Sequence, residues 1–531
     1  MARTKFGAFL APHHPIGEHP MLQFRNDIKF AVRLEELGFD EFWVGEHHST
    51  GWEMIASPEM FLAAVGEHTR RIRLGTGVIS LPYHHPFNVA QRMVQLDYMT
   101  GGRAILGTGP GALPSDAHTL GIDPMTQRDR QDEAIGVIKR LLAGERVTHE
   151  SEWFTLRDAR LQLLPLQEEM EMVAASSISP SGMTLAGKYG MGVLSIGSNS
   201  DAGLAALPTQ WGFAEQAAAK SGKVIDRKNW RVLMSWHIAE TREEARAQAA
   251  KGLMHWHNEY QVGTLMRPGA VPFISPEQAL EQTVDVEGAS AVIGTPDDLI
   301  AAIRKLQANA GGFGVVLGFV HDWANRENTL RSWDLVGRYV IPEINGLLDG
   351  YRDSQAFVIE NREWFERAGQ AVMSKIMSHE GAAAALKAGM EAGVAMRSPN
   401  APDLNKAAKD LKEVPSGPAQ GHPGVAPAWG GPVGAGDRSG RVEQVSGALG
   451  QPRGQVPYRG LKNFGRASPE GEAGAEQGGQ EVARASRRPG QARVAGEPGL
   501  CPVGPQDPDI GPVRDGGDKD RPAQAPSGGE G

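Results

Sequence analysis

The sequence predicts an α/β fold, a (β/α)8 TIM barrel with loop insertions and a disordered C-terminal tail. Short apolar runs, typical of strands buried on both faces, alternate about eight times with helical patterns across residues 1–350. Glycine, serine or histidine residues directly follow several of these runs, as expected where parallel strands deliver functional groups to one end of a barrel. An open, doubly wound sheet is the competing architecture, and the near-regular repeat favours the barrel.

The first half of the chain shows this alternation clearly. Strands are expected at residues 6–10, 42–44, 72–82 and 103–107, and helices at residues 26–37, 58–68, 86–99 and 126–142. Gly38 follows the first helical stretch as a stop signal, and Pro58 stands where the second helix would begin. Gly75 and Gly77 lie inside the third apolar run, where glycine typically marks a bulge or a close approach to the backbone.

The second half continues the pattern with two insertions. Strands are expected at residues 172–175, 192–195, 230–237 and 313–320, and helices at residues 180–189, 204–220, 242–260, 296–309 and 325–348. Thr295 and Pro296 form a capping signal for the helix that ends near residue 309. Residues 153–164 alternate like a small hairpin, and the irregular stretch 266–290 predicts a loop insertion that could act as a lid.

The chain divides by composition into three regions. Residues 1–350 are expected to form the barrel and residues 351–415 a helical C-terminal extension. Residues 416–531 are dominated by Gly, Pro, Ala, Gln and Arg. Such a segment buries too little apolar surface to offset the entropy of ordering, so a disordered, low-complexity tail is expected there.

Composition excludes several classes of function. The chain has 54 basic and 63 acidic residues, a formal net charge of −9, which argues against nucleic acid as a partner. Cys501 is the single cysteine, so neither a disulfide framework nor a thiolate metal cluster is expected. No apolar run reaches the roughly 20 residues that span a bilayer, and the N-terminus lacks the core of a signal peptide. These features predict a cytoplasmic protein without a membrane partner.

Histidine doublets follow three of the expected strands. The run at residues 42–44 ends in Glu46, His47 and His48, and further doublets stand at residues 13–14 and 84–85. At least one histidine of the pair His47–His48 is expected to be functional, with two hydrogen-bonded structural histidines as the alternative. A metal site is the weaker hypothesis, because barrel metal sites typically carry His-x-His on one strand and adjacent doublets direct their rings apart.

Residues 107–112, Gly-Thr-Gly-Pro-Gly-Ala, superficially resemble a dinucleotide-binding fingerprint. That fingerprint has to open a helix, and here Pro114 interrupts, with no helical pattern expected before residue 124. The stretch, including Gly109, is therefore interpreted either as a glycine-lined wall against which a flat ligand can lie or as a tight loop.

Serine residues follow the fifth expected strand. Ser179 suits the N-cap and Pro180 the first position of the next helix, and Ser176, Ser177 and Ser181 lie close by. Free N–H groups, hydroxyls and the positive end of the helix dipole would then form an anion site that fits a phosphate. Plain helix capping is the alternative.

With these motifs in view, the chain resembles the bacterial luciferase-like flavin monooxygenase superfamily from Phe6 to about His379. The segments that carry the resemblance are residues 45–49, 72–78, 80–86, 107–117, 153–159, 178–182, 311–314 and 321–324. One departure is Pro110, near which luciferases carry an arginine that helps to bind phosphate; the serines would then carry more of that load.

The resemblance implies a barrel that binds reduced flavin, FMN or FAD, on its C-terminal face and uses O2 as co-substrate. NAD(P)H would be the electron source, used directly or through a partner NAD(P)H:flavin reductase, and a homo-oligomer is expected. His47 falls at the position of an active-site histidine, where it would handle a proton near neutral pH, and no metal is expected. Relatives often have a non-proline cis peptide that corresponds to Gly77–Val78. The cofactor-binding residues expected are His48, Thr76, Gly77, Val78, Gly109, Ser177, Ser179, Ser181 and Gly182.

The resemblance also implies oxygenation of an apolar small molecule, in particular epoxidation of a monoterpene such as limonene. An apolar wall for it could come from Phe9, Trp52, Trp236 and Trp323, with ordinary core packing favoured for Phe9. Alternatives are a flavin- or deazaflavin-dependent dehydrogenase on the same barrel, a non-catalytic flavin-binding barrel and, more remotely, a metal-dependent hydrolase.

Overall fold

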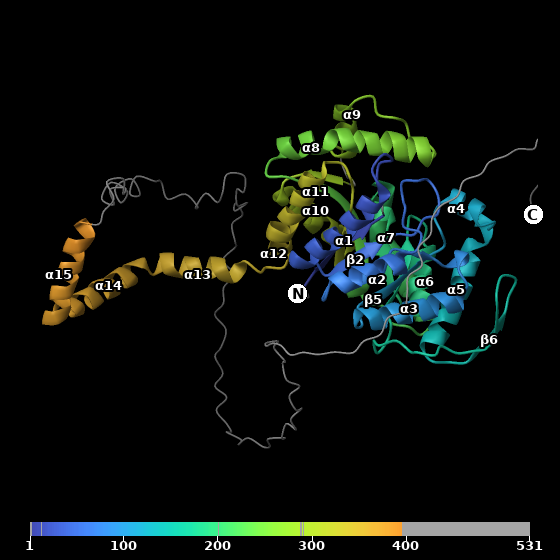
Figure 1. Cartoon of the computed structure of the whole chain (residues 1–531), viewed down its shortest axis with the longest axis horizontal. Helices are drawn as coiled ribbons and strands as arrows, with labels where there is room; N and C mark the ends of the chain where they lie inside the picture. Colours follow the sequence, from blue (N-terminus) through green and yellow to red (C-terminus); the bar gives the residue numbers. More distant parts are fainter. Residues whose placement is uncertain (1–2, 12, 200, 287–288, 290, 396–531) are drawn as a thin grey trace, which may run out of the picture. The chain divides into compact units, whose positions relative to one another are not determined.

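The computed structural model describes residues 3–11, 13–199, 201–286, 289 and 291–395. Eight parallel strands close into a barrel because β10 pairs with both β9 and β12. Helices surround these strands (Figure 1). The predicted barrel is confirmed. Its strands are β1 (Lys5–Leu10), β2 (Glu41–Val44), β3 (Arg73–Thr76), β5 (Ala104–Gly109), β8 (Met172–Ser176), β9 (Gly192–Ser195), β10 (Trp230–Ile238) and β12 (Val315–Phe319).

Apolar side chains pack on both faces of the strands. Inside the barrel, Phe9, Trp43, Leu233, Leu317 and Phe319 belong to one buried cluster. Outside it, the opposite faces of the strands pack against the surrounding helices in a larger cluster. This two-sided burial explains why the strands read as continuous apolar runs.

The helices that cover the barrel largely follow the sequence prediction. α10 begins with the expected cap, a capping box in which the side chains of Thr295 and Asp298 each bond the backbone of the other. Proline stands in the first turn of several others, where its missing N–H costs nothing. The covering helices are α1 (Pro20–Glu36), α2 (Pro58–His68), α3 (Pro86–Thr100), α5 (Gln127–Leu142), α6 (Ser181–Tyr189), α7 (Asp201–Lys220), α8 (Arg242–His255), α10 (Pro296–Ala310) and α11 (Arg326–Leu335).

The glycine-containing stretches depart from simple strands and loops. The third apolar run splits into β3 and β4 (Ile79–Ser80), and the peptide bond between Gly77 and Val78 is cis, as expected. The prediction that no helix precedes residue 124 is wrong, because α4 (Pro114–Thr119) begins with Pro114 in its first turn. A short turn, η2 (Pro124–Thr126), then leads into α5. The hairpin is present but begins earlier than expected, as β6 (Val147–Glu150) and β7 (Thr155–Ala159).

The second insertion is more ordered than the sequence suggested. α8 continues into a π-helical segment, η5 (Trp256–Thr264), and the stretch expected to be irregular contains α9 (Pro276–Thr283). α9 lies beside α8 (Figure 1) and shares an apolar cluster with it. A further parallel strand, β11 (Ala291–Gly294), then pairs with the far end of β10. This insertion therefore extends the wall of the barrel rather than forming a free loop.

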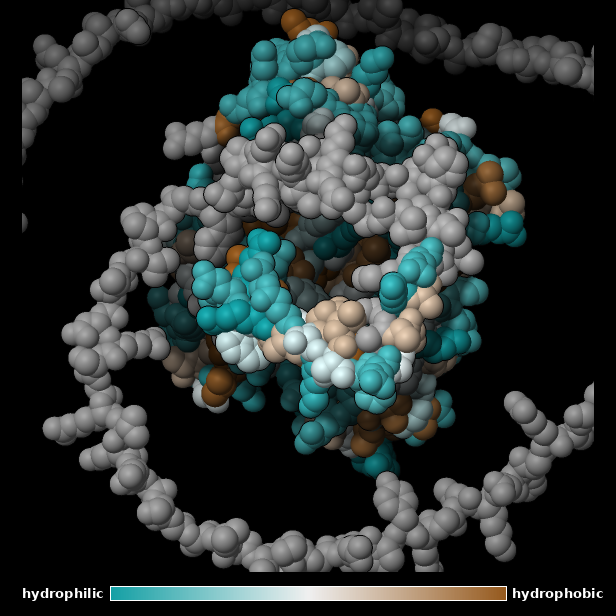
Figure 2. All heavy atoms as spheres, turned by 90° about the vertical axis from the view of Figure 1, so that its left-hand side faces the viewer, coloured by the Kyte–Doolittle hydropathy of each residue, from teal (hydrophilic) through white to brown (hydrophobic). Residues whose placement is uncertain are grey.

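Helices also follow the last barrel element. After η6 (Val336–Val340) and α12 (Ile341–Ile344) come α13 (Asp349–Glu360), α14 (Arg362–Met377) and α15 (Glu380–Ala395). α13 and α14 contain no buried residue. On the face of the molecule seen in Figure 2, hydrophobic residues are scattered among hydrophilic ones. The tail expected at residues 416–531 lies outside the described residues, so the division into three regions stays a prediction. No helix in the described part of the chain combines the length and apolar character needed to cross a membrane.

Candidate active site

A cavity of about 150 Å³ lies at the carboxyl ends of the barrel strands. This is the end at which barrel enzymes place their catalytic residues. Apolar side chains make much of its wall, and a cluster of histidine and carboxylate groups makes the rest. The residues that line it from strand ends are Phe9, Ala11 and His13 after or within β1, Gly45, Glu46 and His47 after β2, Gly77, Val78 and Ser80 around β4, Ile196 after β9, and Phe319 in β12.

His47 is held between two carboxylates. Its Nε2 lies 2.9 Å from Glu53 Oε2, and its Nδ1 lies 3.0 Å from Asp116 Oδ2. Burial alone would lower the pKa of His47, but the charge of Glu53 and the hydrogen bonds to both carboxylates outweigh burial and raise this pKa to about 10. His47 is therefore an imidazolium at neutral pH, with both N–H groups already donated, rather than the group titrating near neutrality that the sequence suggested.

Glu53 connects three parts of the rim. It is 4% exposed, and its carboxylate contacts His47, His13 and the hydroxyl of Tyr260. Burial would raise the pKa of Glu53, but the charges of His47 and His13 lower it well below the usual range. Glu53 is consequently an anion at neutral pH.

Asp116 closes the other side of His47. Besides the bond to the ring, it accepts hydrogen bonds from the backbone N–H of His48 at 3.0 Å and from the hydroxyl of Ser49. Burial would raise its pKa, but these bonds lower it. Sequence reasoning missed both Glu53 and Asp116. The one available signal for Asp116 was Pro114, which marks the first turn of α4 and so places a carboxylate at the rim.

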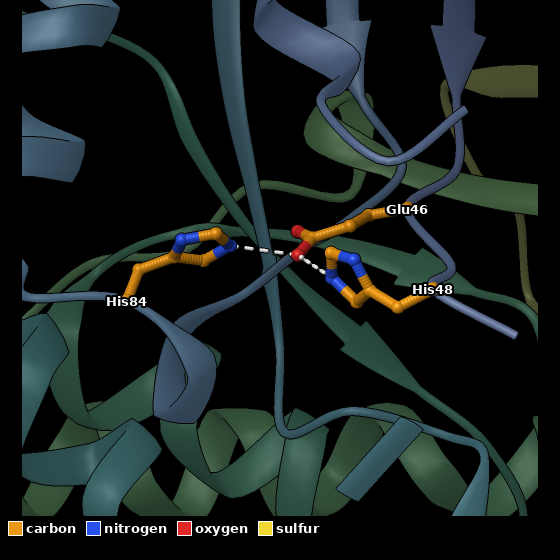
Figure 3. A group of neighbouring side chains, drawn as sticks. All are labelled: Glu46, His48 and His84. Carbon is orange, nitrogen blue, oxygen red and sulfur yellow. Dashed lines mark hydrogen bonds and ion pairs between the residues drawn. The ribbon is translucent and has the colours of Figure 1, made fainter. Parts of the chain in front are cut away.

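A second histidine–carboxylate group lies beside the first (Figure 3). His48 Nε2 and His84 Nε2 lie 2.8 and 2.7 Å from the same oxygen of Glu46, and the other oxygen accepts the backbone N–H of Ser80 at 2.9 Å. Burial would raise the pKa of Glu46, but the hydrogen bonds to the two rings lower it. The arrangement fixes the backbone around His47.

These contacts favour hydrogen bonding over metal binding in the Glu46–His48–His84 group. Ligand atoms on one tetrahedral zinc, with bonds of ~2.0–2.1 Å, stand about 3.4 Å apart, whereas the nitrogen–oxygen distances here are 2.7 and 2.8 Å. Arg92 also brings its guanidinium to 3.5 Å from His84 Nδ1, which places a positive charge beside the group. His48, expected to bind cofactor, directs its ring to Glu46 and is not among the residues that line the cavity.

Glycine residues make one wall of the site flat. A Cβ on Gly109 would lie 2.4 Å from Val78 Cγ2, and a Cβ on Gly77 would lie 2.6 Å from the ring of Phe9. Thr76 is fully buried, and its hydroxyl bonds both the carbonyl oxygen and the N–H of Gly107. Of these predicted residues, Gly77 and Val78 line the cavity, while Thr76 and Gly109 support them from behind. The wall suits a planar group.

The serine segment lies at the start of α6. The helix begins at Ser181 with Pro180 as N-cap, so the prediction that Ser179 is the N-cap is wrong; Ser179 Oγ instead lies 2.8 Å from Ser181 Oγ. A Cβ on Gly182 would meet Ala175 O at 2.1 Å, which keeps the helix close to β8. The carbonyl of Ser177 accepts a hydrogen bond from Gln210 at 2.6 Å.

Ser176, at the end of β8, supplies an observation that the sequence did not. Its side chain is 2% exposed, and its hydroxyl has no hydrogen-bond partner among the described residues. A buried hydroxyl without a protein partner is uncommon and can accept a hydrogen bond from a bound group or donate one to it. Together with the helix start and the neighbouring serines, it fits an anionic group at this part of the rim.

The cavity is covered by η5 and the residues just after it. Trp256, Tyr260, Gln261, Leu265 and Arg267 line it from this side. The covering segment therefore precedes most of the insertion expected to form a lid.

The aromatic residues expected to form an apolar wall divide into two groups. Phe9 belongs to the buried cluster inside the barrel, as expected, and also lines the cavity. Trp52 packs on Tyr260 at 5.4 Å between ring centroids, Trp236 on Trp333 at 4.9 Å, and Trp323 on His321 at 3.9 Å, all behind the wall.

The fold and the site define a (β/α)8-barrel enzyme with a ligand cavity at the carboxyl end of its strands. The sequence profile of the luciferase-like monooxygenase family matches residues 4–312, more than half of the chain. The chain belongs to this family and is a luciferase-like monooxygenase.

Two relatives match this chain over most of their own length. The chain is 48% identical to 4-hydroxyprotoasukamycin monooxygenase of Streptomyces nodosus subsp. asukaensis over 68% of this chain and 97% of the relative. It is 44% identical to limonene 1,2-monooxygenase of Rhodococcus erythropolis over 65% of this chain and 87% of the relative. The fold is similar to that of the oxygenating constituent of 3,6-diketocamphane monooxygenase of Pseudomonas putida, with a TM-score of 0.54, 24% identity, and coverage of 64% of this chain and 98% of that one.

Proposed function

We propose that this protein uses reduced flavin and O2 to epoxidise a carbon–carbon double bond in a largely apolar small molecule, with a monoterpene such as limonene as the first candidate. The observation that carries the proposal is the His47 imidazolium, held by Glu53 and Asp116 beside a glycine-lined cavity. The 44% identity to limonene 1,2-monooxygenase supports a monoterpene as substrate. The 48% identity to 4-hydroxyprotoasukamycin monooxygenase supports a substrate that carries a hydroxyl group.

Two features of the site fit a flavin, FMN or FAD. Gly77 and Val78, supported from behind by Gly109, make a wall with no room for additional side-chain atoms, and the planar ring system would lie against it. The partnerless hydroxyl of Ser176, with Ser177, Ser179, Ser181 and Gly182 at the start of α6, would hold the phosphate. Bound reduced flavin supplies the electrons that activate O2.

The residues of the chain itself then perform three tasks. His47 lines the cavity together with Val78 and is protonated at neutral pH, so it is placed to deliver a proton to oxygen bound there. Glu53 and Asp116 hold its ring in one orientation. Phe9, Phe319 and neighbouring apolar side chains exclude water, which protects the activated oxygen from unproductive release as H2O2.

An anaerobic titration with reduced flavin, followed by a pulse of O2 with limonene, tests the proposal. Epoxide formed in proportion to flavin supports it. Flavin binding with H2O2 as the only product would exclude limonene, and substrate oxidation without O2 would indicate a flavin- or deazaflavin-dependent dehydrogenase. Omitting or adding an NAD(P)H:flavin reductase shows whether NAD(P)H is used directly.

We further infer that the protein is cytoplasmic and forms a homo-oligomer. A single cysteine suits a reducing compartment. Light scattering measures the number of subunits in the assembly.

A further inference from the structure

His13 carries an unused hydrogen-bonding atom at the cavity. The residue follows β1, lines the cavity, and its side chain is 6% exposed. Its Nδ1 has no hydrogen-bond partner among the described residues. A buried polar group left without a partner costs free energy, so an occupant that supplies the partner would recover that free energy on binding.

The ring of His13 is fixed by its neighbours. Tyr260 and Phe319 pack against it at 4.6 and 5.2 Å between ring centroids, and its Nε2 lies 3.4 Å from Glu53 Oε1. With Nε2 beside the carboxylate and aromatic rings packed against the imidazole, Nδ1 is the atom left for a ligand. Phe9 and Phe319 make the nearby wall apolar.

Trp256 repeats the same feature on the covering segment. It lines the cavity, its ring centroid lies 6.1 Å from that of His13, and its Nε1 is also without a partner among the described residues. An indole N–H can only donate, so it requires an acceptor. The Nδ1 of His13 accepts when the ring is neutral and donates when it is protonated.

A hydroxyl group satisfies both of these side chains, because it donates one hydrogen bond and accepts others. A hydrocarbon satisfies neither. We propose that His13 is a substrate-binding residue that, with Trp256, holds a hydroxyl group of an otherwise apolar, unsaturated substrate. This inference rests on the proposed oxygenase function and narrows its substrate class, from any apolar alkene to an alkene that carries a hydroxyl.

The test compares two molecules that share the ring alkene and differ by one hydroxyl, p-menth-1-ene and α-terpineol. Their binding to the flavin-loaded full-length protein is measured by calorimetry, which needs no turnover. The wild type is expected to bind α-terpineol about tenfold more tightly, which corresponds to about 1.4 kcal/mol. In His13→Phe this ratio is expected to fall to about one, whereas His13→Gln, whose amide both donates and accepts, retains part of it.

Controls separate the alternatives. His68→Phe, an exposed histidine at the end of α2, should leave the ratio unchanged. A wild-type ratio near one, or an unchanged ratio in His13→Phe, overturns the inference. A tenfold loss of flavin affinity in His13→Phe with unaltered substrate binding also overturns the inference, because His13 would then bind the flavin and not the substrate. If His13→Phe fails to fold, His13→Gln decides instead: a ratio below that of the wild type supports the inference, and a ratio equal to that of the wild type overturns it.

Oxygenation of the same two molecules is measured separately. Preferential binding of α-terpineol without any epoxide leaves the hydroxyl site standing and contradicts the proposed epoxidation. Epoxide formed equally well from both molecules, with equal binding, contradicts the hydroxyl site alone.

Discussion

The hydroxyl of Tyr260 donates a hydrogen bond to the buried carboxylate of Glu53. Tyr260 belongs to η5, which covers the cavity, and Glu53 lies on the barrel rim, 207 residues earlier in the chain. The same carboxylate holds the rings of His47 and His13. Closure of the covering segment and the orientation of the rim histidines are thus linked through one side chain.

Removing this hydroxyl should loosen the cover while leaving the barrel intact. Tyr260→Phe is expected to cost about 1.5–3 kcal/mol of stability, because a buried charged acceptor loses a donor. More of the O2 consumed should appear as H2O2, since water enters the cavity. The ratio of product to H2O2 and a urea unfolding curve measure both effects. Tyr98→Phe, exposed on α3, is the matched control; an unchanged product ratio in Tyr260→Phe would remove the proposed link.

The pH dependence follows from the elevated pKa of His47. Folding raises this pKa from 6.5 to about 10, so the folded protein binds the proton more tightly than the unfolded chain. The stability contributed by His47 is therefore complete below about pH 6.5 and is lost as the pH rises toward about 10. The carboxylates of Glu53 and Asp116 have lowered pKa values, so their contribution is lost only in acid.

We expect activity to show no His47 titration between pH 6 and 8 and to decline as pH 10 is approached, whereas the free energy of unfolding should fall steadily from about pH 6.5 to about pH 10. The pH dependence of the ring proton resonances of His47 measures its pKa directly. Asp116→Asn removes one of the two charges, so the alkaline decline should begin at lower pH than in the wild type. A His47 pKa between 6 and 7 in the wild type, measured from these resonances, would contradict the ion-paired state.

The site shows which parts of the structure are encoded locally. Strand positions such as 192–195 follow from apolar runs, because a strand buried on both faces leaves no other pattern. Glu53 and Asp116 could not be found in this way. Asp116 meets His47 across 69 residues, and Glu53 follows β2 in an irregular segment without periodicity, so only the closed barrel brings them together.

Some errors came from competing signals in the sequence. Pro114 was interpreted as an interruption, whereas proline is favoured in the first turn of a helix and there begins α4. Ser179 carried the composition of an N-cap, yet the helix starts two residues later. Strand β11 was missed because it is four residues long and lies at the end of the insertion.

The glycine wall leads to a steric prediction. Gly109→Ala places a methyl group 2.4 Å from Val78 Cγ2, which should displace Val78 toward the cavity and weaken flavin binding about tenfold. Overpacking of this kind should also cost about 1–3 kcal/mol of stability. Gly212→Ala on α7, where a Cβ meets nothing within 4 Å, should be neutral or stabilise by up to about 1 kcal/mol. Fluorescence titration with FMN and thermal unfolding measure both quantities; equal flavin affinities in the two variants would show that the wall is not part of the flavin site.

Ser176 provides a test of where the phosphate binds. Its buried hydroxyl has no partner among the described residues, so Ser176→Ala should leave the flavin-free protein as stable as the wild type or slightly more stable. FMN affinity should nevertheless fall about tenfold, while the affinity for riboflavin, which lacks the phosphate, should not change. Ser332→Ala provides the opposite control, because that buried hydroxyl accepts the N–H of Ile238 at 2.8 Å. It should cost stability and alter neither flavin affinity. An equal loss of FMN and riboflavin binding in Ser176→Ala would place the phosphate elsewhere, since a hydroxyl that contacts only the phosphate can distinguish the two ligands and one that contacts the ring cannot.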